Sequence, residues 1–204
     1  SVPVDDDVVT RWLSNPSPKL WHVGLENSEV SRELLFALAS VPSIEQLQFW
    51  GAKIAGDAFI DLPPMERLGS IALARTDAGD HAAEWISQCR RLEDVDLSDS
   101  AITDVGLRDI AQLRALRHLG LSHCPHITDA GVVGLGSLTH LESLSLPAHA
   151  ITAASVESLS KITTLREVIV TGTVEDAALR QRMYYLWDYR EGHEGPYRAL
   201  GKFE

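Results

Sequence analysis

The chain has 204 residues, of which 45% are hydrophobic and 23% charged, and its formal net charge is −11 at pH 7. This composition predicts one soluble globular body, and no apolar run approaches the ~20 residues that a membrane-spanning helix needs. The acidic balance argues against nucleic acid, because phosphate contacts require a basic face of Lys and Arg. We therefore expect no nucleic-acid binding, no membrane insertion and at most a weak preference for basic partners.

Residues 1–19 are expected to form an N-terminal helical cap. An acidic run, Asp5-Asp6-Asp7, precedes Val9, Trp12 and Leu13, which have the spacing of an apolar helix stripe. The segment Ser14-Asn-Pro-Ser-Pro18 then ends the helix and leads into the first strand. Three aspartates could also bind a cation, but helix capping is the favoured interpretation.

From residue 20 onward, one pattern recurs seven times with a period of 24 or 25 residues. Each copy begins apolar-x-x-apolar-x-apolar, and the copies open at Leu20, Ile44, Leu68, Leu92, Leu116, Leu141 and Leu165. Later in each copy, apolar residues recur three apart, as in Leu35, Leu38 and Val41. A short strand pattern followed by a helical pattern, at a fixed period in the twenties, predicts a stacked solenoid of strand-turn-helix units.

Two copies carry nearly the same phrase, Ile102-Thr-Asp-Val-Gly-Leu107 and Ile127-Thr-Asp-Ala-Gly-Val132. With the apolar openings, they resemble the leucine-rich repeat family, and in particular its cysteine-containing subclass, which is found in many F-box substrate receptors and in bacterial proteins. Only Cys124 supplies the subclass cysteine here, and no F-box is present. The resemblance covers residues 20–188. It implies an α/β fold, a right-handed leucine-rich repeat solenoid or horseshoe of seven units, with a parallel sheet on the concave face and helices on the convex face. Residues 189–204 are then expected to be a C-terminal cap or tail.

The second and third units depart from this pattern. Pro63-Pro64 falls inside the expected second helix, and Ala78 stands where other units carry a large apolar turn residue. Proline in a helix interior removes a backbone hydrogen bond and clashes with the preceding turn. Both of these helices are therefore expected to be short or distorted.

Alternate strand residues point away from the core, so the register predicts which side chains line the concave face. Most of these positions hold small residues, and a few large groups stand out: Trp50 with Gln46 and Gln48, and the group of Asp94, Asp96 and His118. Tryptophan is a frequent anchor of protein interfaces, so we expect these six residues to contact a partner. Alternatively, Trp50 folds against the N-terminal units in place of missing core.

The same region contains residue types that could bind a metal or transfer protons. Carboxylates beside His118, His123, Cys124 and His126 are chemically suited to either role. Their spacing matches no known zinc motif, however, and Cys124 belongs to an inward-facing column. We therefore expect no metal and no cofactor. Cys89 and Cys124 fall in different columns, so a disulfide between them is not expected either.

All four tyrosines of the chain lie between positions 184 and 197. Tyr184, Tyr185, Trp187 and Tyr189 follow the seventh set of inward columns, so these aromatic residues either seal the open end of the core or contact a neighbouring domain or a second copy. Sealing the core is the favoured interpretation.

The chain contains no phosphate-binding glycine loop, no Gly-x-Ser-x-Gly elbow and no His-Glu-x-x-His motif, so an enzyme is not expected. The resemblance implies a protein-interaction module with a partner of unknown identity. The alternative is a structural segment of a larger protein that docks through its aromatic C-terminal end. A metal-dependent enzyme is the least favoured possibility. The lack of cysteine-clustered caps points to a cytoplasmic location, and an envelope or secreted location is the alternative if a targeting segment was removed.

Overall fold

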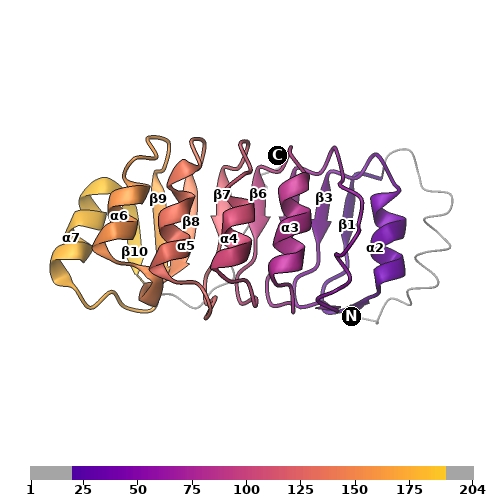
Figure 1. Cartoon of the computed structure of the whole chain (residues 1–204), viewed down its shortest axis with the longest axis horizontal. Helices are drawn as coiled ribbons and strands as arrows, with labels where there is room; N and C mark the ends of the chain where they lie inside the picture. The colour runs from indigo at the N-terminus through magenta and orange to yellow at the C-terminus, as the bar shows by residue number, and fades with distance from the viewer. Residues whose placement is uncertain (1–19, 192–204) are drawn as a thin grey trace.

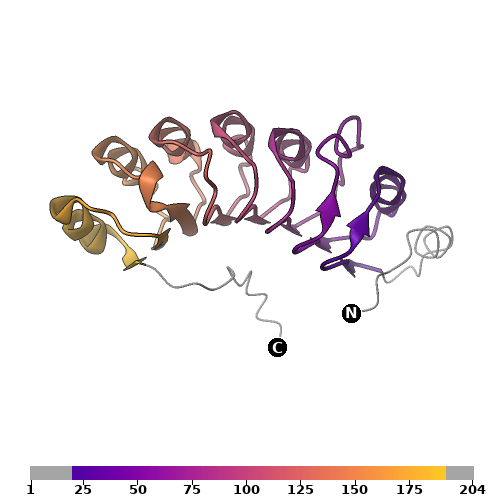
Figure 2. The same ribbon diagram turned by 90° about the horizontal axis from the view of Figure 1, so that it is seen from below.

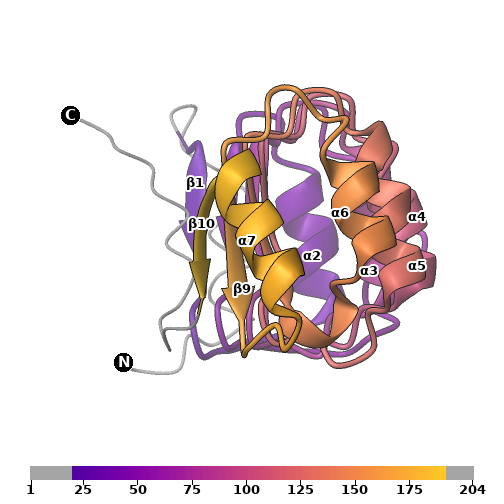
Figure 3. The same cartoon turned by 90° about the vertical axis from the view of Figure 1, so that its left-hand side faces the viewer.

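The computed structural model describes residues 20–191, so the expected cap at 1–19 and the tail from residue 192 onward lie outside the described residues. The described chain forms an arc with strands along its inner side and helices along its outer side (Figure 2). Seen from the end of the arc, strands and helices form two layers (Figure 3). This arrangement confirms the predicted solenoid with a concave sheet.

Within the described residues, the inner layer is one sheet of eight parallel strands in the order β1-β3-β5-β6-β7-β8-β9-β10. Their bounds are β1 (His22–Gly24), β3 (Gln46–Gln48), β5 (Ser70–Ala72), β6 (Asp94–Asp96), β7 (His118–Gly120), β8 (Ser143–Pro147), β9 (Glu167–Thr171) and β10 (Asp188–Glu191). The pairing aligns the residues of the predicted concave column, namely His22, Gln46, Ser70, Asp94, His118, Ser143 and Glu167. The register taken from the apolar repeat is therefore confirmed.

The sheet has one strand more than the seven predicted. Strand β10 pairs with β9 and places Asp188 opposite Glu167, although residues 189–191 were expected to belong to a cap or tail. The two positions are 21 residues apart rather than 24 or 25, and the segment lacks the apolar opening of the other units. A search for the repeat therefore could not find this strand.

The helices of the outer layer lie side by side along the arc (Figure 1). They are α2 (Arg32–Ala39), α3 (Asp80–Gln88), α4 (Asp104–Ile110), α5 (Asp129–Gly134), α6 (Ala153–Leu159) and α7 (Ala177–Leu186). Short elements join the layers: β2 (Glu29–Val30) pairs with β4 (Lys53–Ile54), and two single-turn 3₁₀ helices are η1 (Leu135–Ser137) and η2 (Ala148–Ala150). None of the helices in residues 20–191 is long and apolar enough to cross a bilayer.

The second unit has turns in place of a helix, as Pro63-Pro64 suggested. Residues 56–61 form successive turns with hydrogen bonds such as Ile60 N–H to the Asp57 carbonyl. The third helix is regular, so the expectation that it would be distorted was wrong. Its Trp85 packs on Phe59 and donates from Nε1 to the Pro63 carbonyl at 3.1 Å. This large side chain on α3 covers the space beside the missing second helix.

The aspartates that begin α3, α4 and α5 bind the next unit along the arc. Asp80 accepts hydrogen bonds from the backbone N–H and hydroxyl of Thr103 and from the Gly106 N–H. We call each such contact an aspartate clasp. The second joins Asp104 to the N–H and hydroxyl of Thr128, and the third joins Asp129 to the Thr152 hydroxyl and the Ser155 N–H.

Each threonine in these clasps is also the N-cap of its own helix, since its hydroxyl accepts from a backbone N–H in the first turn. One clasp therefore satisfies several donors at a helix start that would otherwise lack partners. Glycine is needed where the carboxylate approaches: a Cβ at Gly106 would lie 2.6 Å from Asp80 Oδ1. The Thr-Asp-x-Gly phrase of the sequence therefore receives the first two clasps, whereas in the third clasp Thr152 and Ser155 take the places of the threonine and the glycine.

Candidate partner-binding surface

The middle of the concave sheet is a flat platform of small side chains that bind one another. Ser122 donates from its hydroxyl to Ser145 Oγ at 3.0 Å, and its backbone N–H donates to Ser98 Oγ at 3.2 Å. All three serines are buried. Because their hydrogen-bonding groups are used within the sheet, this platform is fixed in place and offers few groups to a ligand.

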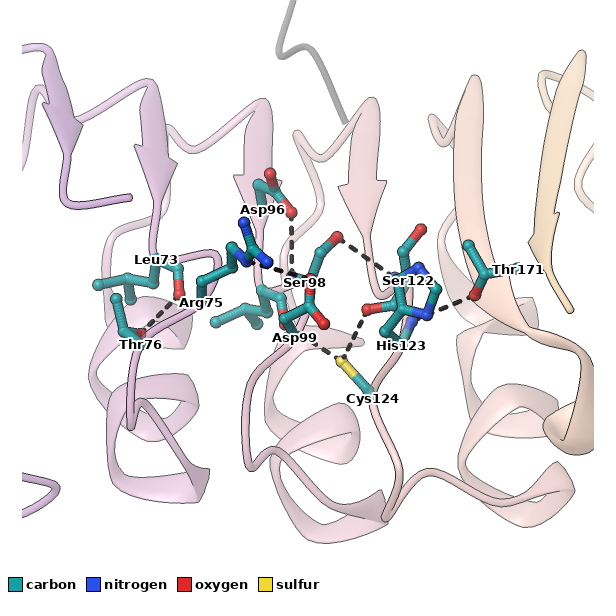
Figure 4. Close-up of polar contacts among 11 residues, drawn as sticks. Leu73, Arg75, Thr76, Asp96, Ser98, Asp99, Ser122, His123, Cys124 and Thr171 are labelled. Carbon is teal, nitrogen blue, oxygen red and sulfur yellow. Dashed lines mark hydrogen bonds and ion pairs between the residues drawn. The ribbon is translucent and has the colours of Figure 1, made fainter. Parts of the chain in front are cut away.

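Asp96 lies within this platform rather than above it. Its side chain is only 4% exposed, and Oδ1 accepts from the Ser98 N–H at 3.0 Å (Figure 4). The carboxylate leans over Gly120 on β7, where a Cβ would collide with it. Burial raises the pKa of this carboxyl, and the Ser98 hydrogen bonds oppose the rise. Asp96 is therefore placed to support the sheet, not to reach a partner directly.

Asp94 and His118 form a carboxylate–imidazole pair on the concave face. They are directly opposite one another on β6 and β7, and Asp94 Oδ1 lies 3.8 Å from His118 Nε2. Both side chains are a little over one third exposed. Desolvation raises the pKa of Asp94 and Glu93 adds to the rise, whereas His118 and Arg117 lower it. The Asp94 carboxylate can accept a hydrogen bond from a partner, and the imidazole adds a second polar group beside it.

Trp50 follows β3 and contacts a residue of the next unit. The Arg75 guanidinium carbon lies 5.2 Å from the centroid of the Trp50 ring, which is cation–π geometry. Trp50 is half-buried, as are Gln46 and Gln48 on β3. The aromatic ring is thus neither free in solvent nor part of the core.

A row of turn residues continues from Trp50 along the carboxyl ends of the strands. Arg75, Asp99 and His123 occupy equivalent positions in successive units, and all three are exposed (Figure 4). Arg75 Nε lies 3.9 Å from Asp99 Oδ2. We call Trp50, Arg75, Asp99 and His123 the carboxyl rim.

The amino edge of the sheet is also charged, and several of its charges are paired with one another. Arg117 contacts both Glu93 and Glu142, and Arg67 contacts Glu45. A shallow pocket of about 370 Å³ lies among these pairs, beside Gly69. Exposed ion pairs of this kind contribute little free energy, and here they occupy the groups that a partner would need.

The candidate metal ligands of the sequence are not brought together. Cys124 is buried and donates from Sγ to the Leu97 carbonyl at 3.1 Å, whereas His118 faces the concave side and His123 is exposed in a turn. Burial raises the pKa of the Cys124 thiol, and that of Cys89 to about 11. In residues 20–191, no three His, Cys, Asp or Glu side chains are grouped so as to hold a metal ion, and both cysteines are free.

The aromatic residues near the C-terminal end separate into two kinds. Trp187 is 8% exposed and belongs to the core, as expected for a residue that seals the solenoid. Tyr184 and Tyr185 on α7 are 71% and 76% exposed, with their rings edge to face at 6.2 Å. Tyr189 lies in β10. Only the first two tyrosines are therefore seen to be accessible to a partner.

The predicted concave residues thus form two groups with β5 between them. Gln46 and Gln48 on β3 and Trp50 just after it make the first, and Asp94, Asp96 and His118 on β6 and β7 make the second. The sequence analysis did not find Arg75. Its signal was present: Gly51 and Gly172 occupy the same turn position in other units, which marks a turn with special backbone geometry.

The fold and this surface define a leucine-rich repeat solenoid. A family model described as Leucine Rich repeat matches residues 88–111 and 112–136. Two crystal structures from Listeria monocytogenes share the fold. An internalin (inlF) has 14% identity and a TM-score of 0.59, with 93% of this chain and 63% of that chain covered. An internalin C2 (inlC2) has 13% identity and a TM-score of 0.55, with 96% of this chain and 88% of that chain covered.

Proposed function

We propose that this chain is a protein-interaction module that presents its concave sheet and carboxyl rim to a protein partner. The observation that carries the proposal is the internally bonded platform of Ser98, Ser122 and Ser145, flanked by larger half-exposed side chains. A surface that is already ordered loses little conformational entropy on binding. Leucine-rich repeat proteins generally act as interaction modules and typically lack catalysis, which supports the same assignment.

The proposed contacts are Trp50, Gln46 and Gln48 on one side and the Asp94–His118 pair on the other. Asp96 is assigned a supporting role, because a side chain that is 4% exposed has almost no surface to bury. Interface energy is concentrated in a few residues, with Trp and Arg enriched among them. We therefore expect Trp50 to contribute more than the two glutamines.

Affinity capture with paired surface variants tests this proposal. The intact chain, a Trp50→Ala, His118→Ala variant and a Tyr184→Ala, Tyr185→Ala variant are each immobilised and exposed to native cell extract. A partner held by the intact chain and the tyrosine variant, with at least about tenfold weaker binding to the concave variant, is the expected result. A partner that binds all three equally would contradict it. Thermal melting by circular dichroism checks that each variant is folded.

A second candidate function rests on the exposure of the tyrosine pair. Tyr184, Tyr185 and the 41% exposed Leu186 form an apolar patch at the end of the helical layer. Such patches mark contact sites in many proteins. In this alternative, the chain is a structural segment of a larger protein, and α7 docks a neighbouring domain or a second copy. Loss of a partner, or of self-association, in the tyrosine variant alone would favour this second function.

A further inference from the structure

Arg75 is held on three sides by neighbouring groups. Its backbone N–H donates to the Ser98 carbonyl at 2.9 Å, its guanidinium stacks on Trp50, and its Nε faces Asp99. The side chain nevertheless keeps 59% of its surface exposed. A charged group that is already fixed, yet accessible, needs little further ordering when it binds.

The backbone at Arg75 is in a left-handed conformation with φ of 58°. Gly51 and Gly172 adopt positive φ at the same turn position, and so do Asn27, Asp99 and His123 in their units. Glycine takes this conformation without strain and asparagine tolerates it, whereas arginine is disfavoured. The turn thus imposes this conformation in successive units and accepts glycine, and Arg75 is the one of these six residues that is not Gly, Asn, Asp or His, the types that adopt it most readily. The backbone therefore does not account for an arginine at this position, which directs attention to its side chain.

The guanidinium has hydrogen-bonding capacity to spare. Asp99 approaches Nε, and within residues 20–191 Arg75 forms no other ion pair at 4.0 Å or less. The terminal nitrogens present two parallel N–H donors, which match a carboxylate in bidentate geometry. Among the described residues of this column, namely Asn27, Gly51, Arg75, Asp99, His123, Ala148 and Gly172, Arg75 is the only Arg or Lys.

We propose that Arg75, stacked on Trp50 and positioned by Asp99, is the anchor of the carboxyl rim and binds an Asp or Glu side chain on an exposed segment of the protein partner. The inference rests on the proposed function and names the chemistry of the partner at that site. The net charge of −11 does not prevent it, because charges more than about 8 Å apart are largely screened at physiological ionic strength.

The test selects linear twelve-residue peptides from a phage-displayed library on the full chain and measures their affinity by titration calorimetry. The recovered peptides are expected to share an Asp or Glu at one position. Changing that residue to its amide, or Arg75→Gly in the protein, should each weaken binding by about tenfold or more, and the two changes together should add little to either alone. Glycine is the natural residue at Gly51 and Gly172, so Arg75→Gly is expected to fold.

Two further variants separate charge from geometry. Arg75→Lys keeps the positive charge but loses the two parallel N–H donors of the guanidinium, so it should weaken binding nearly as much as Arg75→Gly. The matched control is Arg32→Lys on α2, because the Arg32 guanidinium also stacks on a ring, 5.1 Å from the centroid of Phe36, but lies in the outer layer. That control should leave affinity unchanged.

The possible failures are distinguishable. Recovered peptides without a shared acidic residue, or a library that yields none, would overturn the Arg75 assignment. Peptides lost with His118→Ala but retained by Arg75→Gly would overturn it and leave the proposed concave interface in place. Peptides insensitive to both changes would count against both proposals. Displacement by inorganic phosphate, but not by free glutamate, would reassign the anion and overturn the inference.

Discussion

Asp94 and Asp96 stand two residues apart on the same face of β6, yet their surroundings differ. Asp94 faces His118 and keeps part of its surface in water, whereas Asp96 leans over Gly120 and is buried. Because Gly120 has no side chain, the Asp96 carboxylate can pack against the surface of the sheet. Asp94 is therefore accessible from the concave side, whereas Asp96 supports the sheet.

Burial of Asp96 predicts a pH-dependent effect of Asp96→Asn. Because the pKa is raised in the folded protein from 3.8, folding favours the protonated carboxyl. Stability from this group is present below the unfolded pKa and is lost as pH rises through the folded pKa. Asparagine keeps an acceptor for the Ser98 N–H and stays neutral. The melting temperature of the variant relative to the natural chain should therefore be higher at pH 7 than at pH 4.

Glu33→Gln is the matched control, since it removes an exposed carboxylate from α2 and reports the general effect of one negative charge less. Melting curves of all three proteins at both pH values provide the measurement. An Asp96→Asn difference that is the same at pH 4 and pH 7 would show that ionisation of Asp96 does not oppose folding.

The sequence predicted which residues face the concave side, because facing depends only on strand periodicity. It did not predict how deeply each side chain is buried. Asp94 and Asp96 occupy equivalent places in the repeat pattern, and their burial differs because Gly120 leaves room beside Asp96. Arg75 was not predicted because the repeat is defined by its apolar positions, and a left-handed turn does not require an apolar residue. The cysteine-containing subclass, based on Cys124, stays a prediction.

At the scale of elements, helices α3 to α6 are joined by the aspartate clasps as well as by apolar packing. The clasp geometry depends on a close approach of the carboxylate to the next helix start. A Cβ at Gly131 would lie 2.8 Å from Asp104 Cγ and 3.0 Å from Leu107 Cδ1. Glycine is thus required in the middle of α5, where its helix propensity is poor.

Gly131→Ala and Gly134→Ala form a matched pair within α5. The first should destabilise the chain by about 1–3 kcal/mol, because the new methyl group forces the clasp apart. The second meets no atom within 4 Å and has helical backbone angles. It should be neutral or stabilise by up to about 1 kcal/mol, since alanine favours helix. Urea denaturation of both variants measures the difference, and equal effects would contradict a steric role for Gly131.

The strands followed from the sequence more closely than the helices. Seven strands obeyed the apolar openings, but β10 comes three or four residues early and has no such opening. In the second unit, proline correctly indicated the loss of the helix. In the third unit, Ala78 suggested distortion, yet α3 is regular, and its Trp85 packs on Phe59 of the preceding unit. Compensation between units cannot be seen within one copy of the repeat.

At the scale of the whole molecule, the interactions between units are uneven along the arc. Residues 80–155 contain the three aspartate clasps, whereas residues 44–67 have neither a helix nor a clasp within the described structure. In a solenoid, stability is approximately a sum over units and their neighbouring interfaces. The N-terminal part of the arc should therefore open before the centre does.

Hydrogen exchange followed by mass spectrometry tests this order of opening. Amides of residues 56–62, which form only turn hydrogen bonds, should exchange before those of α4 and α5. In an Asp104→Ala variant, which lacks the contact with Thr128, protection of α5 should fall while that of residues 56–62 is unchanged. Uniform protection along the chain, or equal loss in both regions, would contradict the expected distribution.

The aspartate clasp also affects how repeat units could be added to the solenoid. The units that begin at Thr103 and Thr128 each carry both halves of the joint, an aspartate for the following neighbour and a threonine for the preceding one. A tandem duplication of either unit would bring a working joint with it and interrupt none. Asp80 supplies only the first half and Thr152 only the second, so lengthening the array by duplication is simplest between these two residues.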